Sequence, residues 1–122
     1  TTSPGHILQD YASLESYIKF RMVKIDDLEL LLQWERMLFH NILLVPTLPS
    51  SLSENKSIRK ANYVISQIRR LAKTTNYFTS RAYRISLLFN AVRMATFPDL
   101  SKISRDHAIL SASIIARQLD HQ

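Results

Sequence analysis

A chain of 122 residues with 46% hydrophobic content is long enough to bury one core, and this length favours a single domain. It contains one glycine and no cysteine, which disfavours glycine-rich nucleotide loops and excludes disulfides, thiolate metal sites and a cysteine nucleophile. The formal net charge of +6 permits nucleic acid, an acidic peptide or an anionic membrane as partner, without choosing among them.

The chain is expected to begin with a flexible tail over residues 1–6, followed by one helical domain over residues 7–122. Ser3 and Pro4 are suited to be a cap and a first helical residue. Apolar residues then recur at intervals of three and four, which predicts a first helix. Its core stripe is expected to comprise Ile7, Tyr11, Leu14, Ile18 and Met22.

A second helix is predicted to start near Asp27, because Asp26 followed three residues later by Glu29 resembles a capping box, in which the Asp26 carboxylate accepts a free backbone N–H. Asp27 is suited to the same capping role. It should run to Val45, where Pro46 ends it. Apolar residues, among them the only tryptophan, occupy more than one of its faces. We therefore expect it to be the central helix of the domain.

Three further helices follow from the same periodicity. Asn55 or Ser57 caps the first of them, and its core stripe is Ile58, Ala61, Ile65, Ile68 and Ala72. The next is capped by Thr79 or Ser80 and is expected to bury Ala82, Ile85, Phe89 and Val92. The last opens at Ser101 or Ser104 and carries Ala108, Ala112, Ile115 and Leu119. The fold class is all-α, with about five helices.

The helix after Asn55 has the most basic surface in the chain, and its cations are Lys56, Arg59, Lys60, Arg70 and Lys73. Tyr63 lies among them and is suited to stack on a nucleic-acid base while the cations neutralise phosphates. The alternative interpretation is the solvated face of an ordinary amphipathic helix.

No pattern in the sequence indicates catalysis. The four histidines never occur at the i, i+4 spacing of a helical zinc motif. Ser104, Asp106 and His107 are neighbours on one helical turn, a placement that favours a helix start over a catalytic triad. The apolar run over 28–45 contains too many polar residues to span a bilayer. We expect a non-enzymatic protein without catalytic residues, metal, cofactor or membrane segment.

Three short motifs resemble a known family. Ile18-Lys19, the run over 24–28 and the run over 68–71 are similar in order and spacing to the integrase-binding domain of lens epithelium-derived growth factor. That domain belongs with the N-terminal domains of transcription elongation factor IIS and its relatives. The resemblance covers roughly residues 14–97 and implies a compact right-handed bundle built from helical hairpins.

What the resemblance implies is a nuclear, chromatin- or transcription-associated module that docks disordered peptide motifs at its interhelical loops. Its partner-binding residues would be Ile25, Asp26, Asp27, Leu71 and Lys73. Leu71 replaces an aromatic residue of the family and Lys73 an apolar one, which suggests a more acidic peptide. Two alternatives stay open: a basic nucleic-acid-binding domain that uses Lys56, Arg59, Lys60 and Arg70, and a viral or assembly bundle that self-associates.

Overall fold

The computed structural model describes residues 4–43 and 47–121 of the chain. This part is 77% helical and contains no strand, which confirms the all-α prediction. The elements in chain order are α1 Pro4–Tyr17, the π-helical turn η1 Ile18–Met22, α2 Leu28–His40, the single turn α3 Ser50–Ser53, α4 Lys56–Lys73, α5 Ser80–Ala95 and α6 Lys102–Asp120.

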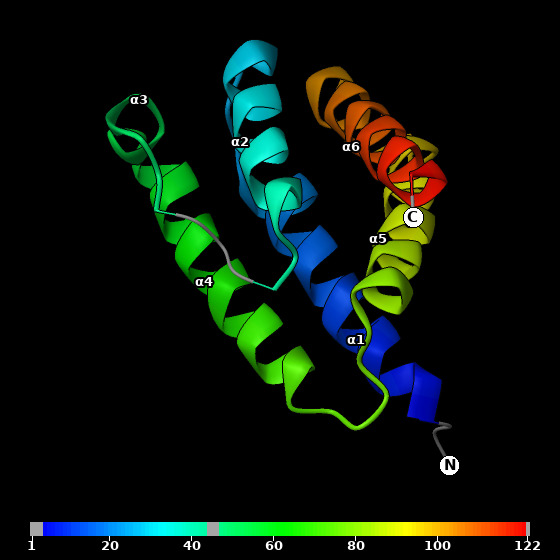
Figure 1. Ribbon diagram of the computed structural model, residues 1–122. Helices are drawn as coiled ribbons and strands as arrows, with labels where there is room; N and C mark the ends of the chain where they lie inside the picture. The colour runs from blue at the N-terminus through cyan, green and yellow to red at the C-terminus, as the bar shows by residue number, and fades with distance from the viewer. Residues whose placement is uncertain (1–3, 44–46, 122) are drawn as a thin grey trace.

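The helices form a bundle in which α4 and α6 lie on either side of α2 (Figure 1). Helix α1 runs behind α2 in this view and packs against α4 on one side and α5 on the other, while α5 and α6 make the most extensive contact. Helix α2, predicted to be the central helix, thus lies between α4 and α6, and α1 connects α4 to α5 behind it.

The main core is built mainly from apolar side chains of α1, α2 and α4, and Leu52 of α3, Tyr83 and Leu87 of α5 and Ile115 of α6 complete it. Trp34, Leu38 and Phe39 of α2 are completely buried in it. A smaller cluster forms where η1 meets α5 and α6, and it comprises Phe20, Ala91, Met94, Leu100 and Ala108. Both clusters belong to one helical bundle.

Four helix starts confirm the predicted capping chemistry. The side chains of Asp27, Asn55, Thr79 and Ser101 accept backbone N–H bonds three residues onward, at 3.1, 3.1, 2.9 and 3.2 Å. Each bond satisfies a donor that the first helical turn leaves unpaired. These caps fix where α2, α4, α5 and α6 begin. The cap of α2 is Asp27 and not Asp26, which is exposed beside it, so the predicted capping box of Asp26 and Glu29 is wrong.

Two predicted boundaries are wrong. Helix α1 begins at Pro4, the residue that the sequence offered as a first helical position, so the expected tail over 1–6 extends too far and is helical from its fourth residue. Helix α2 ends at His40, five residues before Val45, because Asn41 takes an extended backbone and its Oδ1 accepts the N–H of Leu43 at 2.9 Å. Such local side-chain bonds compete with helix continuation. Val45 and the prolyl stop predicted at 46 lie outside the described residues.

The predicted core stripe of the first helix is wrong at three of its five positions, because Ile7, Leu14 and Met22 are exposed, whereas Tyr11 and Ile18 are partly buried against the core. The buried face instead comprises Leu8, Ala12, Glu15, Ser16 and Lys19. In α5 the expected stripe fails in the same way, since Phe89 is 70% exposed and Val92 about half exposed. The positions buried in their place include Tyr83 and Asn90, whose polar groups find partners on α1.

Candidate nucleic-acid interface

Helix α4 is an edge helix with two contrasting faces (Figure 1). Ile58, Ala61, Ile65, Ile68 and Ala72 are buried against the rest of the bundle, as their spacing predicts. None of the residues over 56–73 is acidic, and the nearest carboxylate in the sequence, Glu54, precedes the helix. The face turned to solvent therefore has cations without any acidic residue of the same helix to offset them.

Four cations predicted from the sequence come together on that outer face, and we call them the basic stripe: Lys56, Arg59, Lys60 and Arg70. All four are exposed. The 14-residue step from Lys56 to Arg70 corresponds to roughly 21 Å along a helix axis. Tyr63 lies between the two ends of the basic stripe and is 66% exposed. This arrangement provides charge along a line and an aromatic face in the middle of it.

The position of Tyr63 is supported by hydrogen-bonded neighbours. It lines a hollow of about 330 Å³ between α4 and the segment before it, together with Thr47, Leu48, Ser53, Arg59, Asn62 and Ser66. Arg59 Nη1 donates to the carbonyl of Ser53 at 2.7 Å, which directs its guanidinium to this hollow. The buried Trp34 Nε1 donates to Asn62 Oδ1 at 3.0 Å and fixes the amide at the edge of the hollow.

One cation of α4 points inward. Arg69 is buried and donates from Nε and Nη2 to the two carboxylate oxygens of Glu15, at 2.9 and 2.7 Å. Its Nη1 donates to the carbonyl of Leu38 at 2.6 Å, and the hydroxyl of Tyr83 donates to Glu15 at 3.0 Å. Burial by itself would lower the pKa of Arg69, but the charge of Glu15 raises it above its ordinary value. Arg69 thus anchors α4 to α1, α2 and α5.

A second buried ionic cluster joins η1, α2 and α6. Glu35 Oε1 lies 3.1 Å from Lys19 Nζ and 2.8 Å from His107 Nε2, while Lys19 Nζ donates to Ser111 Oγ at 3.3 Å. Burial opposes ionisation of Glu35, yet Lys19 and His107 outweigh it and lower its pKa to about 2. The ring of Phe39 separates the two clusters, with its centroid 4.6 Å from Lys19 Nζ and 5.5 Å from the Arg69 guanidinium carbon.

Sequence reasoning missed both clusters. Glu35 looked like a polar interruption of an apolar run, and His107 like part of a helix start. The stripe of Leu8, Ala12 and Lys19 has helical spacing, but a charged residue within it gives no sign that it is buried. The clusters have a structural role, because every charged member is paired inside the bundle.

The five residues predicted to bind a peptide do not meet in one place. Asp27 caps the N-terminal end of α2, and Ile25 is partly buried against the core beside it. Lys73 Nζ donates at 2.6 Å to the carbonyl of Leu43, beyond the other end of α2, and Leu71 is 52% exposed one half-turn earlier. The 13 residues of α2 correspond to roughly 20 Å of helix, so they separate the two expected walls.

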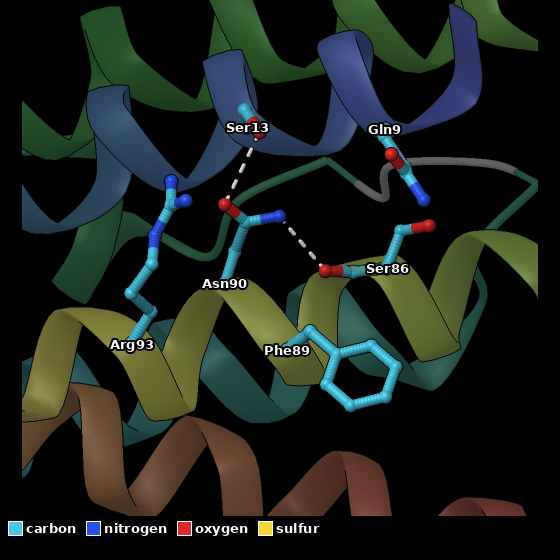
Figure 2. A pocket seen from close by; sticks show the side chains of 6 residues that line it. All are labelled: Gln9, Ser13, Ser86, Phe89, Asn90 and Arg93. Carbon is cyan, nitrogen blue, oxygen red and sulfur yellow. Dashed lines mark hydrogen bonds between the residues drawn. The ribbon is translucent and has the colours of Figure 1, made fainter. Parts of the chain in front are cut away.

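A polar crevice between α1 and α5 is shown in Figure 2. Asn90 lies at its centre; it accepts from Ser13 Oγ at 3.2 Å and donates to the carbonyl of Ser86 at 2.9 Å. Gln9, Phe89 and Arg93 complete the lining. Since the central amide is engaged by both helices, this crevice serves mainly to hold α1 against α5.

Comparison of the chain with protein-family models, with curated proteins and with solved structures gave no match. The resemblance to the integrase-binding domain therefore stays a sequence-based prediction. Among the described residues, no three His, Cys, Asp or Glu side chains are grouped to hold a metal ion. No helix in the described part of the chain is both long and apolar enough to cross a bilayer. The geometry that remains as a candidate site is the outer face of α4.

Proposed function

We propose that the protein is a non-enzymatic module that binds single-stranded nucleic acid along the outer face of α4. The observation that carries the proposal is the basic stripe, four exposed cations on a helix without a carboxylate, with an exposed Tyr63 in its middle. The cations neutralise successive phosphates, and the ring of Tyr63 stacks on an unpaired base. This mode of binding should accept any nucleotide sequence, because every base has a face that an aromatic ring can cover.

The hollow beside Tyr63 supports this role. Asn62 and Ser66 line it with polar groups that can meet the edge or the sugar of a stacked nucleotide. Helix α4 is held rigidly, because its Arg69 donates inside the bundle to the carboxylate of Glu15 and to the carbonyl of Leu38. A fixed helix presents its cations without the entropy loss that a mobile segment suffers on binding.

The location implied by the family resemblance, in the nucleus and in association with chromatin or transcription, agrees with a nucleic-acid partner and forms part of the proposal. Peptide docking at Ile25, Asp26, Asp27, Leu71 and Lys73 is less well supported, because these residues lie at two ends of α2.

The test is a fluorescence titration of a labelled oligothymidylate of about 12 nucleotides, a length within the range of single-strand sites. With four phosphate contacts, the slope of log K against log salt concentration should be roughly −3, and Lys60→Ala should reduce it by about 0.7. A duplex of the same length should bind more weakly, because its paired bases offer no face to Tyr63.

Arg81→Ala is the matched control, since Arg81 is an exposed arginine on α5 and lies outside the basic stripe. It should leave both the affinity and the slope close to those of the unaltered protein. A slope near zero, or an equal loss in Lys60→Ala and Arg81→Ala, would contradict binding at α4.

A further inference from the structure

The outer surface between α2 and α6 carries a groove that is separate from the basic stripe. Two hollows of about 450 and 360 Å³ lie along it. Leu32, Arg36 and Leu110 line both hollows, so the two are neighbours in one continuous groove. Leu28 lines only the first hollow, and Ile114 and Arg117 line only the second. We call this surface the α2–α6 groove.

The apolar part of the groove has the size of a short helical segment. Leu28, Leu32, Leu110 and Ile114 are half-buried, which leaves part of each side chain open to an occupant. The eight-residue step from Leu28 to Arg36 corresponds to roughly 12 Å, or about two turns of helix. A bound helix with apolar side chains at positions i, i+3, i+4 and i+7 has them on one face, and that face can lie along this apolar part of the groove.

The walls of the groove are held at a fixed separation by polar contacts beneath it. Glu35 of α2 lies 2.8 Å from His107 of α6, inside the bundle. The two helices are also joined at one end of the groove, because Gln118 Nε2 of α6 donates to the carbonyl of Phe39 of α2 at 2.5 Å. Figure 1 shows α2 and α6 side by side over this length. The groove is therefore present before anything binds, which reduces the ordering cost of docking.

Charge at the groove selects the kind of occupant. Arg36 and Arg117 are exposed and line the same hollow from opposite walls. Within the described residues, no carboxylate lies within 4 Å of either guanidinium. The acidic lining residue, Glu29, lines only the other hollow, to which Arg36 also extends, and is absent from the lining of the hollow that Arg36 and Arg117 share. An occupant with carboxylates beside Arg36 and Arg117 is complementary to this distribution.

We infer that the α2–α6 groove docks a short acidic peptide segment of a partner protein, bound as about two turns of amphipathic helix. Its apolar side chains rest on Leu32, Leu110 and Ile114, and its carboxylates pair with Arg36 and Arg117. The groove uses α2 and α6, whereas the nucleic-acid proposal uses α4, so either proposal can fail without the other.

The test uses a fluorescein-labelled peptide of about 12 residues, rich in glutamate, with leucines at i, i+3, i+4 and i+7. A scrambled peptide of identical composition, without the leucine stripe, is the probe control. By fluorescence anisotropy, the striped peptide should bind at least about fivefold more tightly than the scrambled one. Arg36→Glu and Arg117→Glu should each weaken it roughly tenfold.

Arg81→Glu makes the same change of charge on α5 and should alter the affinity by less than about twofold. Equal binding of the two peptides, or an equal loss in Arg81→Glu, would reduce the interaction to general charge attraction and overturn the proposal. In amide chemical-shift maps of the unaltered protein, we expect the striped peptide to perturb Leu32, Leu110 and Ile114. Perturbation confined to α4 would also overturn it.

Discussion

The Nε2 atom of His107 lies 2.8 Å from Oε1 of Glu35, although 72 residues separate them in the sequence. Because an ionised carboxylate can only accept hydrogen bonds, Nε2 must carry the hydrogen in this contact. Lys19 donates to the same carboxylate from η1. The charge of Glu35 thereby joins three separate segments of the chain at one buried point.

Stability should fall as the pH drops from about 4.5 to 2, because the pKa of Glu35 is lowered from 4.5 to about 2 by folding. The unfolded chain takes up a proton in this range and the folded one does not, so the loss amounts to roughly 3 kcal/mol of unfolding free energy. Urea unfolding at a series of pH values measures it. Glu35→Gln should remove this contribution, whereas Glu54→Gln, at an exposed position, should keep it. Identical pH profiles for Glu35→Gln and the unaltered protein would contradict the assignment.

Arg69→Met should destabilise the fold by roughly 3–5 kcal/mol, because it leaves the buried charge of Glu15 without its partner. Arg70→Met is the natural control at the next position, which is exposed, and should cost less than about 0.5 kcal/mol. The double variant Glu15→Gln/Arg69→Met should recover part of the loss, since no unpaired charge remains. Chemical denaturation of these four proteins and of the single variant Glu15→Gln gives the comparison, and strictly additive losses of Glu15→Gln and Arg69→Met would argue against the pairing.

Asp27→Ala should lower the unfolding free energy by about 1 kcal/mol, because the bond from the N–H of Leu30 to its carboxylate is lost. Asp26→Ala, one residue earlier and exposed, should change it by less than about 0.5 kcal/mol. Thermal unfolding of both variants shows which of the two carboxylates caps α2. A larger effect at Asp26 would show that the other carboxylate starts the helix.

Tyr63→Ala should weaken oligothymidylate binding roughly tenfold, since stacking of one base contributes about 1–3 kcal/mol. Tyr63→Phe should keep most of the affinity, because the ring is retained. The salt slope should be the same in all three proteins, as Tyr63 makes no charge contact. Folding should not change, given that this side chain is 66% exposed. A Tyr63→Ala protein that binds as tightly as the unaltered one would remove stacking from the mechanism.

The parts of the fold that the sequence predicted well are those that depend on neighbouring residues. Asn55, Thr79 and Ser101 cap helices because their side chains reach N–H groups three residues away. The basic stripe was predictable for the same reason, since all its members lie on one helix. Its cations lie on the same face of α4 regardless of which helices pack against the opposite face.

The parts that sequence reasoning missed depend on which helices meet. Lys19 is buried because it reaches Ser111, 92 positions away, and Glu35 on a third segment. Phe89 is exposed because the neighbouring Asn90 has Ser13 as a partner on α1 and takes the inward position. The α2–α6 groove likewise exists only where two distant segments lie side by side. Helical periodicity depends only on the polarity of residues within one segment, so it carries no information on partners from distant segments.

The shared carboxylate of Glu35 also constrains how this sequence can diverge. Replacing Lys19, Glu35 or His107 alone leaves a charged or polar group buried without its partner, which is strongly destabilising. An apolar substitute for the whole set is tolerated far better than any single step toward it. Descendants of this fold should therefore retain the three positions together or exchange them together. In an alignment of such descendants, residues 19, 35 and 107 would vary as one unit.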